Sequence, residues 1–185
     1  MKKVFLIFLT VSVISMLAGC NKSNSKAHLS QSNISPNTSM YTGILDDLKS
    51  NLSDSYYFIK DIDGDNSPDL LVLNNTKLSV YSYEKSARLI GEQDFLTGTV
   101  RFFSSDNSEY PGIFYFTVGG GANHYGYMSI KNQKLFFEDL WEENYASEST
   151  DTTENIKALS TDKKLIEESK RLYKNNSDMD FILLK

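Results

Sequence analysis

Short apolar runs bounded by turn residues follow one another from residue 56 to residue 138. Some alternate apolar with polar side chains and others are continuously apolar, which is typical of half-buried and fully buried β-strands. We predict eight strands, at residues 56–59, 70–73, 78–83, 87–91, 100–103, 113–118, 125–130 and 135–138. Their regular spacing favours an antiparallel meander, folded as one open or strongly curved sheet.

Helical spacing replaces this pattern on both sides of the predicted sheet. Residues 41–52 carry apolar side chains roughly every three or four positions, with Ser39 or Thr42 as the expected cap. A second helix is predicted to begin after Thr161, its expected cap, and residues 181–184 to return as a short edge strand. The apolar face of this second helix is expected to consist of Leu165, Ile166, Ser169, Leu172 and Tyr173. We therefore predict the α+β class, mostly β, with the sheet flanked by an N-terminal and a C-terminal helix.

The first nineteen residues differ in character from the rest of the chain. Lys2 and Lys3 precede an apolar run at residues 4–16, which ends in the sequence Leu-Ala-Gly-Cys at residues 17–20. The run is shorter than the roughly 20 residues that span a bilayer, and its layout is that of an export signal. Its last four residues resemble a bacterial lipobox. The resemblance implies that Cys20 is lipidated and becomes the mature N-terminus.

Three parts of the chain follow from this pattern. They are a lipoprotein signal peptide at residues 1–19, the lipidated cysteine with a flexible tether at 20–40, and one globular domain at 41–185. The tether is rich in Ser, Asn and Lys, and its mean reach is about 25 Å. The lipid would hold the domain at the extracytoplasmic face of the cell membrane, and the composition favours a Gram-positive source. Because Cys20 is the only cysteine, a disulfide within the chain is excluded.

Composition and charge narrow the class of partner. Once Lys2 and Lys3 are removed, 17 basic and 24 acidic side chains remain, which gives a formal charge of −7. The sequence has no basic stripe with interleaved aromatic residues, and this argues against a nucleic-acid partner. We expect a monomer attached to the membrane through Cys20, with an envelope protein or a glycan as its ligand.

The stretch between the first two predicted strands carries the clearest candidate chemistry. Acidic residues occupy positions one, three, five and nine of the segment 61–69, and a serine occupies position seven. Ca²⁺ takes about six to eight oxygen ligands, so its loop must aim several oxygens inward within a few residues. We predict a calcium site formed by the carboxylates of Asp61, Asp63, Asp65 and Asp69 and the backbone carbonyl of Ser67. The alternative is an acidic turn without a metal, since these residue types are common in turns.

Two features separate this loop from a helical EF-hand. Position six, a glycine in EF-hands, is Asn66, which tolerates the same backbone conformation, and position twelve is Val72 in place of a bidentate glutamate. Flanked by strands, the sequence Asp-x-Asp-Gly-Asp-x-x-x-Asp-Leu resembles the calcium loops of FG-GAP and VCBS-type repeats. It is also similar to the single DIDGDG segment of small Gram-positive lipoproteins. The resemblance implies a structural Ca²⁺ that joins two strands.

A glycine run at residues 119–121 follows one of the predicted strands. It lacks the lysine and the following helix of a phosphate loop, so we predict a hairpin connection. The alternative is a ligand-contacting loop made of Gly120, Gly121, His124 and Tyr125, with His124 and Tyr125 at its tip.

A second group of carboxylates lies at residues 138–143, beside aromatic residues. Its members are Glu138, Asp139, Glu142 and Glu143. Paired carboxylates hydrolyse glycans only when they face each other across a cleft, which adjacency in the sequence does not show. A Ser-His-Asp triad would depend on His124, the only histidine of the predicted domain.

Three hypotheses for function remain. The leading one is a non-enzymatic, calcium-stabilised lipoprotein domain that binds a partner outside the cell membrane. The alternative is an envelope enzyme that processes glycan or peptide with the carboxylates near 138–143. The third is a calcium sensor, which requires an affinity within the local range of free calcium.

Overall fold

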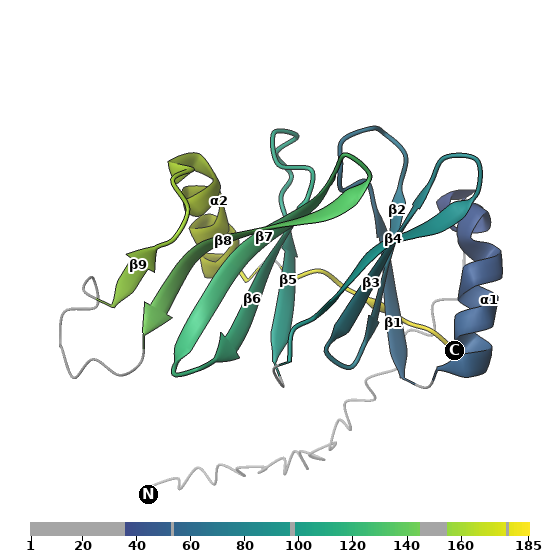
Figure 1. The fold of residues 1–185 in the computed structure, drawn as a ribbon, viewed down its shortest axis with the longest axis horizontal. Helices are drawn as coiled ribbons and strands as arrows, with labels where there is room; N and C mark the ends of the chain where they lie inside the picture. Colours follow the sequence, from purple (N-terminus) through teal and green to yellow (C-terminus); the bar gives the residue numbers. More distant parts are fainter. Residues whose placement is uncertain (1–35, 53, 97–98, 145–154, 177) are drawn as a thin grey trace, which may run out of the picture. The chain divides into compact units, whose positions relative to one another are not determined.

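The residues that the structure describes form two five-stranded antiparallel sheets and two α-helices (Figure 1). The structure is a computed structural model that describes residues 36–52, 54–96, 99–144, 155–176 and 178–185. Its mostly β, α+β architecture confirms the predicted fold class. The predicted signal peptide, Cys20 and most of the predicted tether lie outside the described residues.

The first sheet, called sheet A, has the strand order β10-β1-β2-β3-β4. Its strands are β1 (Ser55–Lys60), β2 (Asp69–Asn74), β3 (Lys77–Tyr83), β4 (Ala87–Asp94) and β10 (Ile182–Leu183). A short 3-10 helix, η1 (Pro36–Tyr41), leads into helix α1 (Thr42–Asn51) before the first strand. β10 pairs with the outer edge of β1, which confirms the predicted return of the chain.

The second sheet, called sheet B, has the strand order β5-β6-β7-β8-β9. Its strands are β5 (Val100–Ser104), β6 (Ile113–Gly119), β7 (Ala122–Lys131), β8 (Lys134–Asn144) and β9 (Ile156–Ala158). Helix α2 (Lys163–Lys174) follows β9. All eight predicted strands are therefore present as β1 to β8, and β9 is an addition that the apolar pattern did not indicate.

The prediction of one continuous sheet is wrong, because the meander breaks between β4 and β5. β4 pairs with β3 and β5 pairs with β6. A Cβ atom built on Gly91 of β4 would lie 3.0 Å from the Cβ of Leu135 in β8. β4 therefore meets sheet B through side chains on its face, and the chain starts a new sheet at β5.

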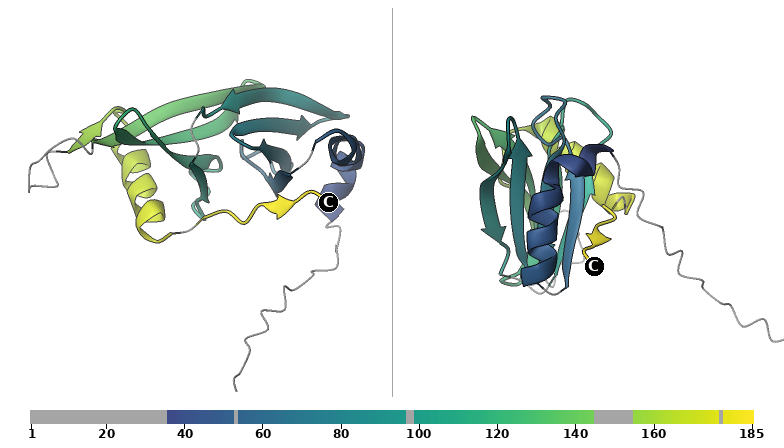
Figure 2. Two further views of the ribbon diagram at one scale, coloured as in Figure 1. Left: turned by 90° about the horizontal axis from the view of Figure 1, so that it is seen from below. Right: turned by 90° about the vertical axis from the view of Figure 1, so that its right-hand side faces the viewer.

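Among the described residues, three apolar clusters hold the layers together. Figure 2 shows the sheets and the two α-helices from two further sides. Successive residues of a strand point to opposite faces, and β2 shows this clearly. Leu70 and Val72 pack with Leu45 of α1, whereas Leu71 packs in the central cluster with Met128 of sheet B. The third cluster joins the other face of sheet B to α2. Each sheet is thus covered by one helix on one side and by the other sheet on the other.

The helix caps differ from those predicted. α1 begins without a side-chain cap, and the Thr42 hydroxyl donates a hydrogen bond to the Ser39 carbonyl. The cap of α2 is Asp162 in place of Thr161, since the Asp162 carboxylate accepts a hydrogen bond from the Leu165 N–H at 3.0 Å. The predicted apolar face of α2 is confirmed by its buried residues Leu165, Ile166, Ser169 and Leu172.

Candidate functional site

The loop between β1 and β2 places three acidic side chains around one point. Asp61, Asp63 and Asp65 each offer a carboxylate oxygen, and these oxygens lie within 4.8 Å of one another. Three of the five predicted metal ligands therefore come together. Their spacing of two residues brings alternate side chains of the turning loop to its inner side.

The same side chains fold the loop. The Asp61 carboxylate accepts hydrogen bonds from the N–H groups of Asp63 (3.2 Å), Gly64 (2.7 Å) and Asn66 (2.8 Å). Asp63 and Asp65 then accept from the N–H groups two residues further on, at 3.1 and 2.6 Å. Each carboxylate thus closes a local turn, as Asp side chains commonly do.

Two residues of the loop have a left-handed backbone. Gly64 has φ +81° and Asn66 has φ +67°. Asn is one of the few residue types besides glycine that visit this region routinely. Asn66 thus has the glycine-like backbone expected of it. That the segment is a calcium loop stays a prediction.

Asp69 lies beneath the loop at the start of β2, and its side chain is only 1 % exposed. Its Oδ2 accepts a hydrogen bond from the Ile62 N–H at 3.0 Å. Burial, with a smaller contribution from Asp63 and Asp65, raises the pKa of Asp69 to about 7. Burial also raises the pKa of Asp63, and Asp65 and Asp61 add to that effect. Both carboxyls thus lie where a nearby cation would favour their ionised form.

The Ser67 side chain turns away from the carboxylates. Its hydroxyl donates to the Tyr83 carbonyl at 3.2 Å. The neighbouring Pro68 carbonyl accepts a hydrogen bond from the Tyr41 hydroxyl at 2.8 Å. These two contacts fix the end of the loop to β3 and to the residue before α1. Ser67 remains a predicted ligand through its backbone carbonyl only.

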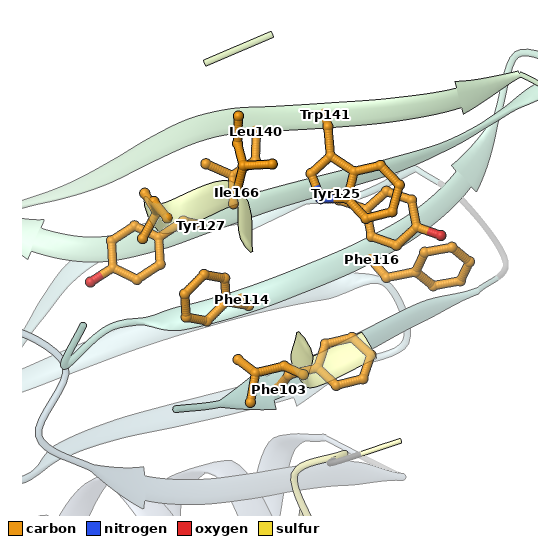
Figure 3. Packing of buried hydrophobic residues seen from close by; sticks show 10 residues of the cluster. Phe103, Phe114, Phe116, Tyr125, Tyr127, Leu140, Trp141 and Ile166 are labelled. Carbon is orange, nitrogen blue, oxygen red and sulfur yellow. The ribbon is translucent and has the colours of Figure 1, made fainter. Parts of the chain in front are cut away.

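The glycine run forms a hairpin connection between β6 and β7, as predicted. Gly120 and Gly121 have φ +62° and +85°, and two successive positive φ values are typical of the tight type I′ turn. His124 and Tyr125 lie inside β7 and not at the tip of the hairpin. The Tyr125 ring is stacked on Trp141 at 3.5 Å between centroids, within the core between sheet B and α2 (Figure 3).

The carboxylates of residues 138–143 have separate partners. Glu138 binds the Ser160 hydroxyl, and Glu143 binds the Asn123 amide. Asp139 accepts a hydrogen bond from the Tyr115 hydroxyl at 3.3 Å. Glu142 forms an ion pair with Lys157 at 3.2 Å, and its Oε2 lies 3.9 Å from His124 Nδ1. They do not form one acidic cluster.

The contact between His124 and Glu142 was not predicted from the sequence. His124 and Glu142 are direct neighbours in the register of β7 and β8. The sequence carries no signal for that register, because a bulge at Tyr125/Gly126 shifts the pairing within the strand. One predicted loop residue, His124, and one predicted carboxylate, Glu142, therefore meet on one face of sheet B.

Comparison of the chain with protein-family models, with curated proteins and with solved structures finds no match. Within the part of the chain that the structure describes, neither helix has the length and apolar character needed to cross a bilayer.

Proposed function

We propose that this protein is a lipid-anchored extracytoplasmic domain that binds Ca²⁺ in its 61–69 loop and acts by binding a partner. The observation that carries the calcium proposal is the carboxylate cluster of Asp61, Asp63 and Asp65, together with the buried Asp69 beneath it. The anchor rests on the lipobox resemblance at residues 17–20.

The donor set suits a hard cation. It consists of carboxylate oxygens without nitrogen or sulfur, a composition that favours Ca²⁺ or Mg²⁺ over transition metals. Among the described residues, none of these four aspartates forms an ion pair with lysine or arginine. A bound Ca²⁺ would offset the repulsion between them and draw the β1 and β2 ends of the loop together.

A thermal unfolding experiment tests the metal. Ligand that binds only the folded state adds RT ln(1 + [Ca²⁺]/Kd) to the free energy of unfolding, about 2.7 kcal/mol at a hundredfold excess over Kd. We expect calcium to raise the melting temperature of the EDTA-treated protein, and Asp63→Asn to abolish the rise. Asp180→Asn, the same change at an exposed aspartate outside the loop, should leave the rise intact.

The titration also separates two roles for calcium. A midpoint far below the free calcium of the surroundings means a permanently occupied structural site. A midpoint within that range means a sensor. No shift at any calcium concentration in the unaltered protein would leave the loop as an acidic turn.

The anchor has an independent test. Cys20→Ala should move the protein from the membrane fraction to the soluble fraction and remove labelling by radioactive palmitate. If the variant stayed in the membrane fraction and kept its palmitate label, Cys20 would not be the lipidated residue, whatever the outcome with calcium.

The alternative, an envelope enzyme that processes glycan or peptide, is favoured by one observation. Asp139 and Glu142 line the same groove on sheet B. An enzyme would release soluble products from purified cell-wall material, and Glu142→Gln would stop the release. Absence of turnover by the unaltered protein, with its fold intact, would leave the binding role.

A further inference from the structure

A groove of about 620 Å³ lies on the face of sheet B that carries His124 and Glu142. Side chains from β6, β7 and β8 line it, together with the end of β4 and Leu159. This volume is within the range of about 300 to 1,000 Å³ that small-molecule sites occupy. The groove is formed by elements other than the β1–β2 loop, so it is separate from the candidate metal site.

The strand register builds the floor of the groove in two rows. In the first row Thr117, His124 and Glu142 lie side by side across β6, β7 and β8. In the second row Tyr115 and Asp139 flank Gly126. Each row therefore ends in a carboxylate on β8.

Gly126 gives Tyr115 its position. A Cβ atom at residue 126 would lie 2.1 Å from Cζ of the Tyr115 ring, so only glycine leaves room for the ring to cross β7. The ring thereby brings its hydroxyl to Asp139. Burial raises the pKa of this hydroxyl, with Asp139 adding to the effect, so the group stays a neutral hydrogen-bond donor.

Aromatic and aliphatic side chains form the walls. The centroids of the Phe95 and Phe137 rings lie 5.2 and 6.2 Å from the centroid of the Tyr115 ring. Leu96 stands beside Phe95 with 85 % of its surface exposed and with φ +51°, a conformation that is uncommon for residues other than glycine. The exposed Leu96 side chain at the rim of the groove can therefore cover a bound ligand.

The charge of the lining selects the ligand. Asp94, Asp139 and Glu142 contribute three carboxylates, and no lysine or arginine is among the lining residues. Glu142 already pairs with the ammonium group of Lys157. Asp139 accepts a hydrogen bond from the neutral Tyr115 hydroxyl. Among the described residues, Asp139 forms no ion pair with lysine or arginine. An anion would be repelled here. A neutral sugar could donate hydroxyl hydrogen bonds to these carboxylates, but only a cation also offsets their charge.

We propose that this groove binds an aliphatic amine, with the ammonium group on Asp139 and the hydrocarbon part against Phe95, Tyr115 and Phe137. Carboxylate pairing favours an ammonium group on Asp139, and the aromatic rings favour the hydrocarbon part beside it. The amine belongs either to a small polyamine or to a lysine side chain of a peptide. The Lys157 ammonium on Glu142 shows the same chemistry within the protein itself.

Calorimetric titration of the full-length protein in non-ionic detergent tests the proposal. The probes are spermidine, a Gly-Lys-Gly peptide and chitotriose as the neutral sugar. We expect at least one amine to bind and chitotriose not to bind. Whichever amine binds more tightly identifies the source of the ammonium group.

Two groove variants and one control variant test whether the amine binds in the groove. Asp139→Asn and Glu142→Gln keep the shape of the side chains. The first should weaken amine binding at least tenfold, and the second, whose charge Lys157 already offsets, only a few-fold. Glu167→Gln removes the same charge from an exposed position on α2 and should not change it. Equal binding by all three variants, or binding of chitotriose alone, would overturn the proposal. Measuring with and without calcium separates this result from the fate of the metal proposal.

Discussion

The acidic loop and the groove on sheet B both gather carboxylates, but by different means. In the loop they come from nearby positions of one segment, 61–69, and backbone N–H groups hold them. In the groove Asp139 and Glu142 come from β8 and Asp94 from β4, and side chains such as Tyr115 and Lys157 contact the two on β8. The loop concentrates negative charge that lysine and arginine do not neutralise, which suits a divalent ion. The groove spreads its charge among aromatic rings, which suits a single ammonium group.

Burial separates the two regions as well. Asp69 beneath the loop is almost fully buried, whereas Asp139 in the groove is exposed. A charge change at a buried site alters the free energy of unfolding, and one at an exposed site alters little except binding. Substitutions in the loop should therefore change the free energy of unfolding. Charge changes in the groove should mainly change the affinity for its ligand.

The largest effect should come from a groove residue that acts through packing. Gly126→Ala forces a methyl group into the Tyr115 ring and should lower the free energy of unfolding by about 3 kcal/mol, the upper end of common overpacking costs. Urea denaturation measures it. Gly43→Ala, where the added methyl meets no atom within 4 Å, should instead stabilise helix α1 by about 0.5 kcal/mol. Equal effects at both positions would show that Tyr115 is not held by Gly126.

Removal of calcium should come next. Chelation with EDTA should lower the free energy of unfolding by about 2.7 kcal/mol relative to a hundredfold excess of calcium over Kd. The affinity of the remaining folded protein for spermidine should not change, because the loop contributes no lining residue to the groove. A parallel loss of amine affinity would show that the two regions are coupled.

The pH dependence of the EDTA-treated protein should have an unusual sign. The pKa of Asp69 is raised in the fold to about 7 from 3.8, so the folded state retains a proton that the unfolded state releases. The free energy of unfolding should therefore be highest near the unfolded-state pKa of 3.8 and should fall as pH rises from there towards 7. The slope should reach up to about 1.4 kcal/mol per pH unit.

Asp69→Asn is the control for this dependence, since the amide does not titrate. Calcium should flatten or reverse the slope, because the ion favours the carboxylate. The pKa values of Glu92, Asp94 and Glu168 are lowered, chiefly by hydrogen bonds, so these groups lose their contribution only at more acidic pH. A slope that persists unchanged in Asp69→Asn would assign it to another group.

The smallest effect on stability should follow Lys157→Ala. Lys157 is 65 % exposed, so loss of its ion pair with Glu142 should change the free energy of unfolding by less than about 0.5 kcal/mol. Amine binding should nevertheless strengthen a few-fold, because Glu142 becomes available to the ligand. Weaker amine binding in this variant would mean that Lys157 orients Glu142 for the ligand.

The same contrast explains which features the sequence could predict. The carboxylates of the loop are set by local spacing, and Asp61, Asp63 and Asp65 meet as expected. Strands β1 to β8 follow from their apolar runs. The groove depends on which strand positions lie side by side, and the bulge at Tyr125/Gly126 decides that. Such a register arises from packing across the sheet, which no local pattern records.

Two further differences have the same origin. At the break between the sheets, β4 packs against β8 through Gly91 and Leu135, residues far apart in the chain. Tyr125, expected at a hairpin tip, belongs to the core because helix α2 covers that face of sheet B and Trp141 stacks on its ring. The three residues of β9 are too few to show an alternation of their own.

The pairing of β10 with β1 has a consequence for self-association. β1 would otherwise present a six-residue edge whose backbone groups could pair with a second molecule. Leu183 lies opposite Tyr56, and the Leu184 N–H donates to the Ser55 carbonyl at 2.8 Å, so β10 covers the start of this edge. β10 itself offers only two residues as the new edge. Since every other element precedes β10 in the chain, the edge of β1 stays open to aggregation until residues 182–184 have docked.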